Sequence, residues 1–257
     1  MERIKNRQGI SASTLKVIAV ITMLIDHIAA AVLVRMLWTG MAGTTGVTRE
    51  EFIDLYMVMR QIGRTAFPIY CYMLVEGLKY TRNQWKYLAR LGVFALISEV
   101  PFDLAFHSKV LEFSYQNVYF TLFFGLLTLI VIKEFEGKSF LMQRIAARSI
   151  LIAVTAGAGM GLAALFQTDY GAYGVCCILV LYLLRERKVL QMFAGYAAFV
   201  ILLDEWAAFP AFLLILLYRG KKGFSAKWFF YGFYPVHLLA IYYACVCMGI
   251  SYCPALR

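Results

Sequence analysis

Long runs of apolar residues alternate with short polar connections along the whole chain. A helix that crosses a membrane needs about 20 mostly apolar residues, and nine stretches come close to this length. They run over residues 15–37, 62–78, 88–106, 118–132, 147–166, 171–184, 189–203, 206–218 and 228–249. The pattern therefore predicts an all-α, polytopic membrane protein with about nine transmembrane helices. The weakest assignments are 189–203 and 206–218, which only Asp204 and Glu205 separate.

Basic residues are concentrated on alternate connections. Of the 25 lysine and arginine residues, 19 fall on connections that the nine-helix pattern places on the side of the N-terminus. Cytoplasmic loops carry an excess of Lys and Arg, so the pattern predicts a cytoplasmic N-terminus and an outer C-terminus. The longest connection, residues 38–61, lies on the outer side. Its amphipathic stretch from Thr48 to Arg60 favours a short interfacial helix.

The composition agrees with a membrane protein and excludes other classes. Hydrophobic residues make up 62% of the chain and charged residues 16%, whereas a soluble domain has roughly 45–50% and about 25%. One integral membrane domain over residues 1–257 is expected, with the lipid bilayer as its surroundings. The net charge of +10 then reflects cytoplasmic loops and not a nucleic-acid partner. The cysteines have no zinc-site spacing, so no metal is expected.

Ionisable groups inside a membrane are costly, which makes each of them a candidate for function. The apolar segments hold few ionisable or strongly polar side chains: Asp26, His27, Arg64, Glu76, Glu99, Asp103, Asn117 and His237. Long side chains at helix ends reach the polar interface, which explains Arg64 and Glu76. It does not explain Asp26 and His27, which lie well inside their segment.

Lys16 and His27 are 11 residues apart, which is almost three helical turns, so both side chains share one helix face. They are about 16 Å apart along the axis, with the lysine at the cytoplasmic surface and the histidine deep in the membrane. This arrangement suits a long ligand with an anionic head and a reactive tail, such as acetyl-CoA. The alternative is a boundary lysine and a structural histidine bonded to a neighbouring helix.

The other polar residues have two interpretations each. Neighbouring residues on a helix point about 100° apart, so Asp26 is expected to contact a different helix, through an arginine such as Arg64. A carboxylate from elsewhere, Glu99 or Asp103, is expected to orient His27. These groups are equally compatible with ion pairs that only hold helices together.

His237 follows a proline in the last segment, in Tyr234-Pro235-Val236-His237. A proline removes one helical hydrogen bond and opens the backbone. The histidine is expected either to cap the freed carbonyls or to line a cavity.

Several short motifs occur in the order in which the TraX family carries them. They are Leu15-Lys16-Val17-Ile18-Ala19, Met23-Leu24-Ile25-Asp26-His27, Ile62-Gly63-Arg64 with Phe67-Pro68, Val75-Glu76-Gly77, Tyr80-Thr81-Arg82-Asn83, Tyr87-Leu88-Ala89-Arg90-Leu91, Phe94-Ala95-Leu96-Ile97-Ser98-Glu99-Val100-Pro101-Phe102, Asn117-Val118-Tyr119-Phe120-Thr121-Leu122 and Tyr234-Pro235-Val236-His237-Leu238. The chain therefore resembles this family over nearly its whole length, most densely through residue 125.

The resemblance implies a multi-pass protein of the bacterial inner or plasma membrane with acyltransferase activity. The founding TraX protein acetylates the N-terminus of a conjugative pilin, and the family is similar to the acyltransferase-3 proteins. Those proteins carry a basic residue, ten intervening residues and a catalytic histidine, a spacing that Lys16 and His27 match. The resemblance thus implies a catalytic His27, and it implies that Arg64 matters for function.

The resulting hypothesis is a membrane-embedded O- or N-acyltransferase that uses cytoplasmic acetyl-CoA as co-substrate. His27 acts as general base beside Asp26, and Lys16, Arg64, Arg82 and Arg90 bind the CoA. The orienting or oxyanion-stabilising residues are drawn from Glu99, Asp103, Asn117 and His237, with Arg64 or a tyrosine hydroxyl as further oxyanion donors. The acceptor at the outer face, whether a glycan, a small molecule or a protein N-terminus, stays open, as does direct against two-step transfer.

Two other classes of function remain. One is a proton-coupled transporter that uses Asp26, His27, Glu99 and Asp103 as a relay. The other is a non-catalytic TraX-type membrane scaffold, for which Lys16 and His27 should matter little.

Overall fold

The computed structural model describes residues 9–137 and 145–251. Several residues used in the sequence predictions therefore lie outside the described residues, namely Arg3, Lys5, Arg7, Lys138, Arg144, Cys253 and Arg257. In the described part of the chain the regular structure is helical, as predicted, apart from two isolated β-bridges.

The chain folds into two compact units. The first combines Met1–Tyr70, Pro101–Val110 and Glu205–Arg257, and the second combines Cys71–Val100 and Leu111–Asp204. Helices α4 (Ala66–Tyr80) and α5 (Gln84–His107) begin in one unit and end in the other. The predicted single membrane domain over residues 1–257 stays a prediction.

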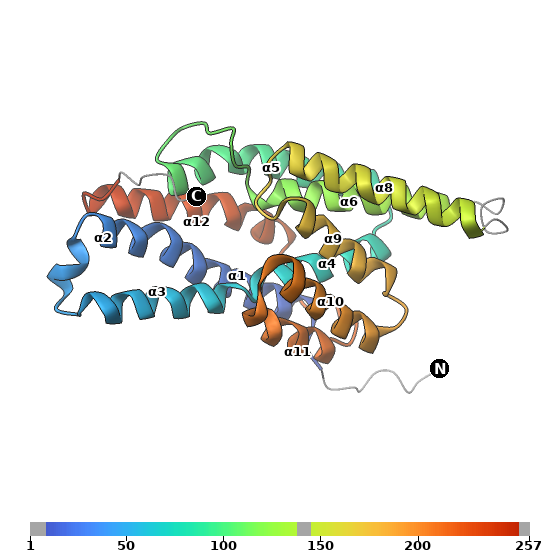
Figure 1. Cartoon of the computed structure of the whole chain (residues 1–257), viewed down its shortest axis with the longest axis horizontal. Coiled ribbons are helices and arrows are strands. Elements are labelled where there is room, and N and C mark those ends of the chain that lie inside the picture. Colours follow the sequence, from blue (N-terminus) through green and yellow to red (C-terminus); the bar gives the residue numbers. More distant parts are fainter. Residues whose placement is uncertain (1–8, 138–144, 252–257) are drawn as a thin grey trace. The chain divides into compact units, whose positions relative to one another are not determined.

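The first unit is built around one long helical element and two helices that pack along it (Figure 1). The long element consists of α1 (Ala12–His27), a π-helical segment (Ile28–Leu33) and α2 (Val34–Trp38). The remaining elements of this unit are the 3₁₀ segments Met41–Thr45 and Trp206–Ala208, α3 (Arg49–Gly63), α11 (Phe209–Leu217), α12 (Lys227–Cys247) and the parts of α4 and α5 given above.

Helices α1 and α12 run parallel, since residues later in α1 contact residues later in α12. The ammonium group of Lys16 lies over the ring of Phe230, His27 contacts His237, and Ala31 packs against Ile241 farther along. Two membrane spans of one chain are parallel when an odd number of other spans lies between them, and seven lie between the first and the last predicted segment. The predicted pattern of spans has this parity.

The helix expected over residues 48–60 is present as α3, which extends to Gly63, and its place at the membrane interface stays a prediction. A capping box between Thr48 and Glu51 starts the helix, and Phe52 is buried in a cluster with Leu33. The helix then runs antiparallel to α1, and its last residue, Gly63, approaches Asp26 so closely that a Cβ there would collide with the aspartate. Its length and this close approach make α3 a packing partner of the first span.

The second unit contains the rest of α4 and α5 with α6 (Val118–Glu136), α8 (Ile145–Leu165), α9 (Gly171–Leu183) and α10 (Lys188–Leu203). Glycines allow close packing around α6. A Cβ at Gly159 of α8 would collide with Thr128, and a Cβ at Gly125 would collide with Ile178 of α9. Small residues at such crossings are typical of helices that associate inside membranes.

Within the described residues, four helices are long and apolar enough to cross a membrane by length and composition. They are Ala12–Trp38, Val118–Glu136, Ile145–Leu165 and Lys227–Cys247. Three apolar helices are shorter, namely Gly171–Leu183, Lys188–Leu203 and Trp206–Leu217. Each of the nine predicted segments contains a helix, including the two weakest, whereas nine membrane crossings stay a prediction.

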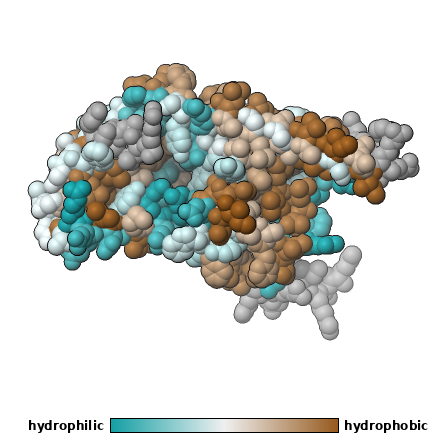
Figure 2. All heavy atoms as spheres, viewed as in Figure 1, coloured by the Kyte–Doolittle hydropathy of each residue, from teal (hydrophilic) through white to brown (hydrophobic). Residues whose placement is uncertain are grey.

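The exposed side chains support a membrane environment. Ile150 and Val154 of α8 and Phe193 and Ile201 of α10 are exposed, and Figure 2 shows broad apolar areas on part of the visible face, beside hydrophilic ones. Water-soluble monomers rarely expose apolar patches of more than a few hundred Å². A polytopic membrane protein is therefore the class of protein that this structure and composition fit.

Candidate functional site

His27 and His237 form a hydrogen-bonded pair in the first unit. His27 is the last residue of α1, directly before the π-helical segment, and His237 lies in the middle of α12. The Nδ1 atom of His27 is 2.7 Å from Nε2 of His237, and the two rings are stacked with centroids 5.0 Å apart. The π-helical turn after His27 is notable because such turns occur frequently at functional sites.

The second ring nitrogen of each histidine is in a different situation. Nδ1 of His237 donates a hydrogen bond to the carbonyl oxygen of Phe233 at 2.7 Å. Nε2 of His27 makes no hydrogen bond to any residue in the ranges 9–137 and 145–251. One nitrogen of the pair is therefore uncommitted within the described structure, and it belongs to the histidine on the first span.

Aromatic rings surround the pair. Phe106 and Tyr234 meet the ring of His27 edge-on, with centroids 5.3 and 5.8 Å away, and Phe233 stacks on His237 at 4.7 Å. His237 is buried and His27 is partly exposed. The aromatic rings thus shield the pair, so that water competes little for its hydrogen bonds.

The two expectations for His237 are resolved in part. It does bond a carbonyl of its own helix, but this is the carbonyl of Phe233, whereas Pro235 removes the bond to the carbonyl four residues earlier, that of Tyr231. Its other nitrogen contacts His27. The histidine therefore links α12 to α1, a contact between residues 210 positions apart that no local pattern indicates.

Asp26 contacts a different helix, as predicted, but its arginine partner is Arg60 and not Arg64. Arg60 Nη1 lies 2.6 Å from Asp26 Oδ2, and Gly63 lets α3 approach the aspartate. Arg64, the residue after α3, pairs instead with the buried Glu205 at 2.9 Å. Two arginines from the end of one helix thus reach two acidic groups in different segments of the same unit.

Lys16 and His27 share a helix face, as their spacing predicts, and that face contacts α12. The Lys16 ammonium lies 5.6 Å from the centre of the Phe230 ring. The start of α1 also binds the basic loop before α12, since the amides of Ala12 and Ser13 donate to the carbonyls of Lys221 and Lys222. The start of the first span and the basic loop before the last span therefore lie together, whereas their cytoplasmic location stays a prediction.

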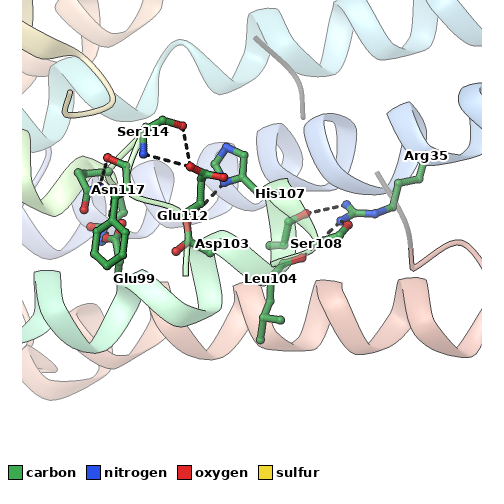
Figure 3. A network of polar contacts seen from close by, with 12 residues as sticks. Arg35, Glu99, Asp103, Leu104, His107, Ser108, Glu112, Ser114 and Asn117 are labelled. Atoms are coloured by element: carbon green, nitrogen blue, oxygen red, sulfur yellow. Dashed lines mark hydrogen bonds and ion pairs between the residues drawn. The ribbon is translucent and has the colours of Figure 1, made fainter. Parts of the chain in front are cut away.

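Arg35 is a buried residue that the sequence reasoning did not select, although it lies inside the first apolar segment. Its guanidinium donates to the carbonyls of Ala31 at 3.0 Å and Ala105 at 2.6 Å, and to the hydroxyl of Ser108 at 3.1 Å. Figure 3 shows this side chain reaching the end of α5. A cation at a helix C-terminus satisfies its last carbonyls. Arg35 thereby fixes the turn of α5 that carries Phe106.

Asp103 lies in the same unit and is fully buried, but the described contact of its side chain is with His107, at 3.4 Å. The partner at Nδ1 of His27 is His237. The expected carboxylate beside His27 is therefore replaced by a second imidazole.

Glu99 and Asn117 lie in the second unit and bind each other. The Asn117 amide donates to a carboxylate oxygen of Glu99 and, at 2.9 Å, to the carbonyl of Ala95. Its side-chain oxygen accepts a bond from the amide of Tyr119 at 3.0 Å, which caps the start of α6. Figure 3 shows this pair at the beginning of α6. The amide hydrogens of Asn117 are used, so it is a poor candidate for an oxyanion donor.

The two remaining predicted residues also lie in the second unit. Arg82 is exposed in the short connection between α4 and α5, and the Arg90 guanidinium lies over the ring of Tyr87, 5.8 Å from its centre. Their role in CoA binding stays a prediction.

Comparison with known proteins identifies the family. The sequence matches the TraX protein family over residues 11–244. The chain belongs to the TraX family. It is 32% identical over 256 residues to a protein of Dichelobacter nodosus described as "Probable fimbrial assembly protein FimC, serogroup H1". That match covers 89% of this chain and 93% of the relative. No solved structure matches the TraX chain.

Proposed function

We propose that this TraX protein is a membrane-embedded acyltransferase. It transfers an acyl group from cytoplasmic acyl-CoA, with acetyl-CoA as the expected donor, to a hydroxyl or amine acceptor at the outer face. The observation that carries the proposal is the state of His27, whose Nδ1 is bound by His237 while Nε2 is uncommitted within the described residues. A histidine so arranged inside a membrane segment has the chemistry of a general base.

The reaction needs one proton movement that His27 can perform. Nε2 takes the proton from the acceptor O–H or N–H as the acceptor attacks the thioester carbonyl carbon. The tetrahedral intermediate then breaks its carbon–sulfur bond, and the CoA thiolate takes the proton back from His27. General base catalysis of this kind contributes typically 10²–10⁴-fold. An acyl-histidine intermediate is the two-step alternative.

The basic residues at the start of the first and last spans supply the charge that CoA phosphates require. Lys16 lies on the same face of α1 as His27, and Lys221 and Lys222 are held at the start of this helix by main-chain hydrogen bonds. Since the pantetheine arm of CoA is long, a head group near Lys16 and a thioester near His27 fit the axial spacing of about 16 Å.

Arg64 remains the leading candidate for stabilising the oxyanion, together with a tyrosine hydroxyl. Its guanidinium binds the buried carboxylate of Glu205, and a guanidinium carries five N–H donors in all. Asp26 is assigned a positioning role, because its carboxylate is bound by Arg60 on α3. It is therefore not the group that orients the His27 imidazole.

Binding of the donor tests this proposal without knowledge of the acceptor. Titration calorimetry of acetyl-CoA into the full chain in lipid nanodiscs is expected to show saturable binding that weakens at least several-fold in Lys16→Met. The methionine keeps the apolar stem, and Lys79→Met, near the exposed Tyr80 ring, is the matched control. A folded protein that binds neither acetyl-CoA nor a longer acyl-CoA would refute the proposal.

A non-catalytic assembly role is the second candidate, because the Dichelobacter nodosus relative is named a probable fimbrial assembly protein. For a scaffold, substitutions of Lys16 and His27 should leave assembly intact. The proton-coupled transporter stays an alternative that proton-driven uptake without acyl-CoA would favour.

A further inference from the structure

The contacts of the histidine pair decide which nitrogen of His27 carries a proton. The carbonyl oxygen of Phe233 can only accept a hydrogen bond, so Nδ1 of His237, 2.7 Å away, carries a hydrogen. In an uncharged imidazole the other nitrogen, Nε2, then has the lone pair. His27 Nδ1, at 2.7 Å from this Nε2, must therefore be the donor.

The same argument leaves the lone pair of His27 on Nε2. An uncharged pair is the state expected in a membrane segment, where a charge is costly. The main-chain carbonyl of Phe233 in α12 can only accept, so this fixed end of the two hydrogen bonds sets the donor in each of them. Without that fixed end, either nitrogen of His27 is free to hold the proton.

We propose that His237 is a positioning residue that holds His27 in the Nδ1–H tautomer, so that the uncommitted Nε2 is the basic nitrogen. This inference rests on the proposed function only where it concerns acyl transfer. His237 occupies the place that a carboxylate or carbonyl takes beside many functional histidines, where the partner fixes tautomer and ring orientation. Unlike a carboxylate, it does so without adding a negative charge to the membrane interior.

The aromatic contacts explain why the direction is stable. Phe233 stacks on His237, with ring planes 12° apart, and provides the accepting carbonyl from the same residue. Phe106 and Tyr234 hold the His27 ring edge-on. Both imidazoles are thereby restricted in rotation, and exchange of their two nitrogens would break the bond between them.

Three variants of His237 separate positioning from packing. The His237→Gln side chain places a carbonyl oxygen near the position of Nε2 and can accept from His27. His237→Asn retains an amide donor near the position of Nδ1 for the Phe233 carbonyl, but it is too short to reach His27. His237→Phe keeps an aromatic ring and loses both bonds.

The tautomer is measured directly by nitrogen-15 NMR of histidine-labelled full-length protein in nanodiscs. The chain has three histidines, so His107→Gln and His27→Gln assign the signals. Nδ1–H is expected for His27 in the wild type and in His237→Gln, with loss of this preference in His237→Asn and His237→Phe. A wild-type His27 protonated on Nε2, or a His237→Phe variant that keeps Nδ1–H, would overturn the inference.

Acetyl transfer supplies the second readout. In His237→Asn and His237→Phe, kcat is expected to fall by about 10- to 100-fold, the scale of lost orienting partners, while KM for acetyl-CoA changes less than about twofold. His237→Gln should restore most of kcat. Equal activity of the Gln and Asn variants would show that His237 only packs. If the wild type transfers no acetyl group but shows the inferred tautomer, the proposed function fails and the tautomer assignment stands.

Discussion

Two polar pairs between helices, one in each unit, show what separates a structural contact from a candidate reactive one. In the second unit, Glu99 and Asn117 bind each other, and every polar group of the asparagine has a partner. In the first unit, His27 and His237 also bind each other, but one nitrogen makes no hydrogen bond to the described residues. Both pairs connect helices, but all the side-chain polar atoms of Asn117 are used, whereas His27 keeps Nε2 uncommitted within the described residues.

The comparison teaches that burial and polarity alone do not identify a site in a membrane protein. Both pairs are costly to place among apolar helices, and both would be selected by a search for intramembrane polar groups. The number of hydrogen bonds that each side chain has left to make distinguishes them. For Asn117 none of the amide hydrogens is left, because it caps α6.

The largest effect on stability is expected at the pair of Asn117 and Glu99. Asn117→Leu removes the cap of α6 and a partner of Glu99, and it should lower the free energy of unfolding by about 2–4 kcal/mol, combining an unsatisfied buried group and a lost cap. Denaturation in mixed micelles measures this. Asn83→Leu, at an exposed cap of α5, should cost about 1 kcal/mol. A loss of activity per folded molecule in Asn117→Leu would break the comparison.

A somewhat smaller effect is expected where α3 meets α1. Gly63→Ala would place a Cβ against the Asp26 side chain, and such overpacking typically costs about 1–3 kcal/mol. Gly161→Ala in α8 is the control, since a Cβ there meets nothing within 4 Å and alanine is the better helix former by roughly 0.5–1 kcal/mol. Equal stability of both variants in the same micelle assay would contradict the close approach.

The ion pair between Asp26 and Arg60 should contribute less. A double-mutant cycle with Asp26→Asn and Arg60→Met is expected to give a coupling energy of about 1 kcal/mol, because the pair is only partly exposed and lies between surface and buried pairs in strength. The surface pair of Arg185 and Glu186 should give a coupling close to zero. If Asp26 couples to Arg64 and not to Arg60, the position of α3 is wrong.

The smallest effect on stability is expected at the start of α3, at the capping box of Thr48 and Glu51. Hydrogen bonds from the Thr48 amide and hydroxyl hold the pKa of the Glu51 carboxyl below its ordinary value. A depressed pKa stabilises the helix start above the unfolded pKa, and this contribution is lost as pH falls through the folded pKa. Hydrogen exchange over residues 49–53 should increase slightly at low pH, and less so in Glu51→Gln. Glu50→Gln is the control that keeps the response.

The sequence predicts much of the fold because apolar length and charge distribution act locally. Each predicted segment contains a helix, and the spacing of Lys16 and His27 correctly predicts that they share a helix face, which contacts α12. The partner of Asp26 was not predictable in this way. Arg60 and Arg64 are four residues apart and share a helix face, so only the packing of α3 chooses between them.

The two histidines could be predicted as candidate residues, but their contact could not. Both were selected as intramembrane polar residues, but their contact depends on how α1 and α12 pack, which local spacing does not encode. Arg35 had a signal that was available, since it is a charge inside the first apolar segment. Its bonds to the end of α5 depend on how the first span packs, which the sequence does not show.

The most direct test of the account compares acetyl transfer by the wild type and His27→Gln. Inside-out membrane vesicles containing the full chain receive radiolabelled acetyl-CoA, and label transferred to envelope material is counted per folded protein. The account predicts a fall of about 10²–10⁴-fold in His27→Gln with unchanged thermal stability, while Asn83→Leu keeps wild-type transfer. A folded His27→Gln protein that transfers acetyl groups at the wild-type rate would contradict it.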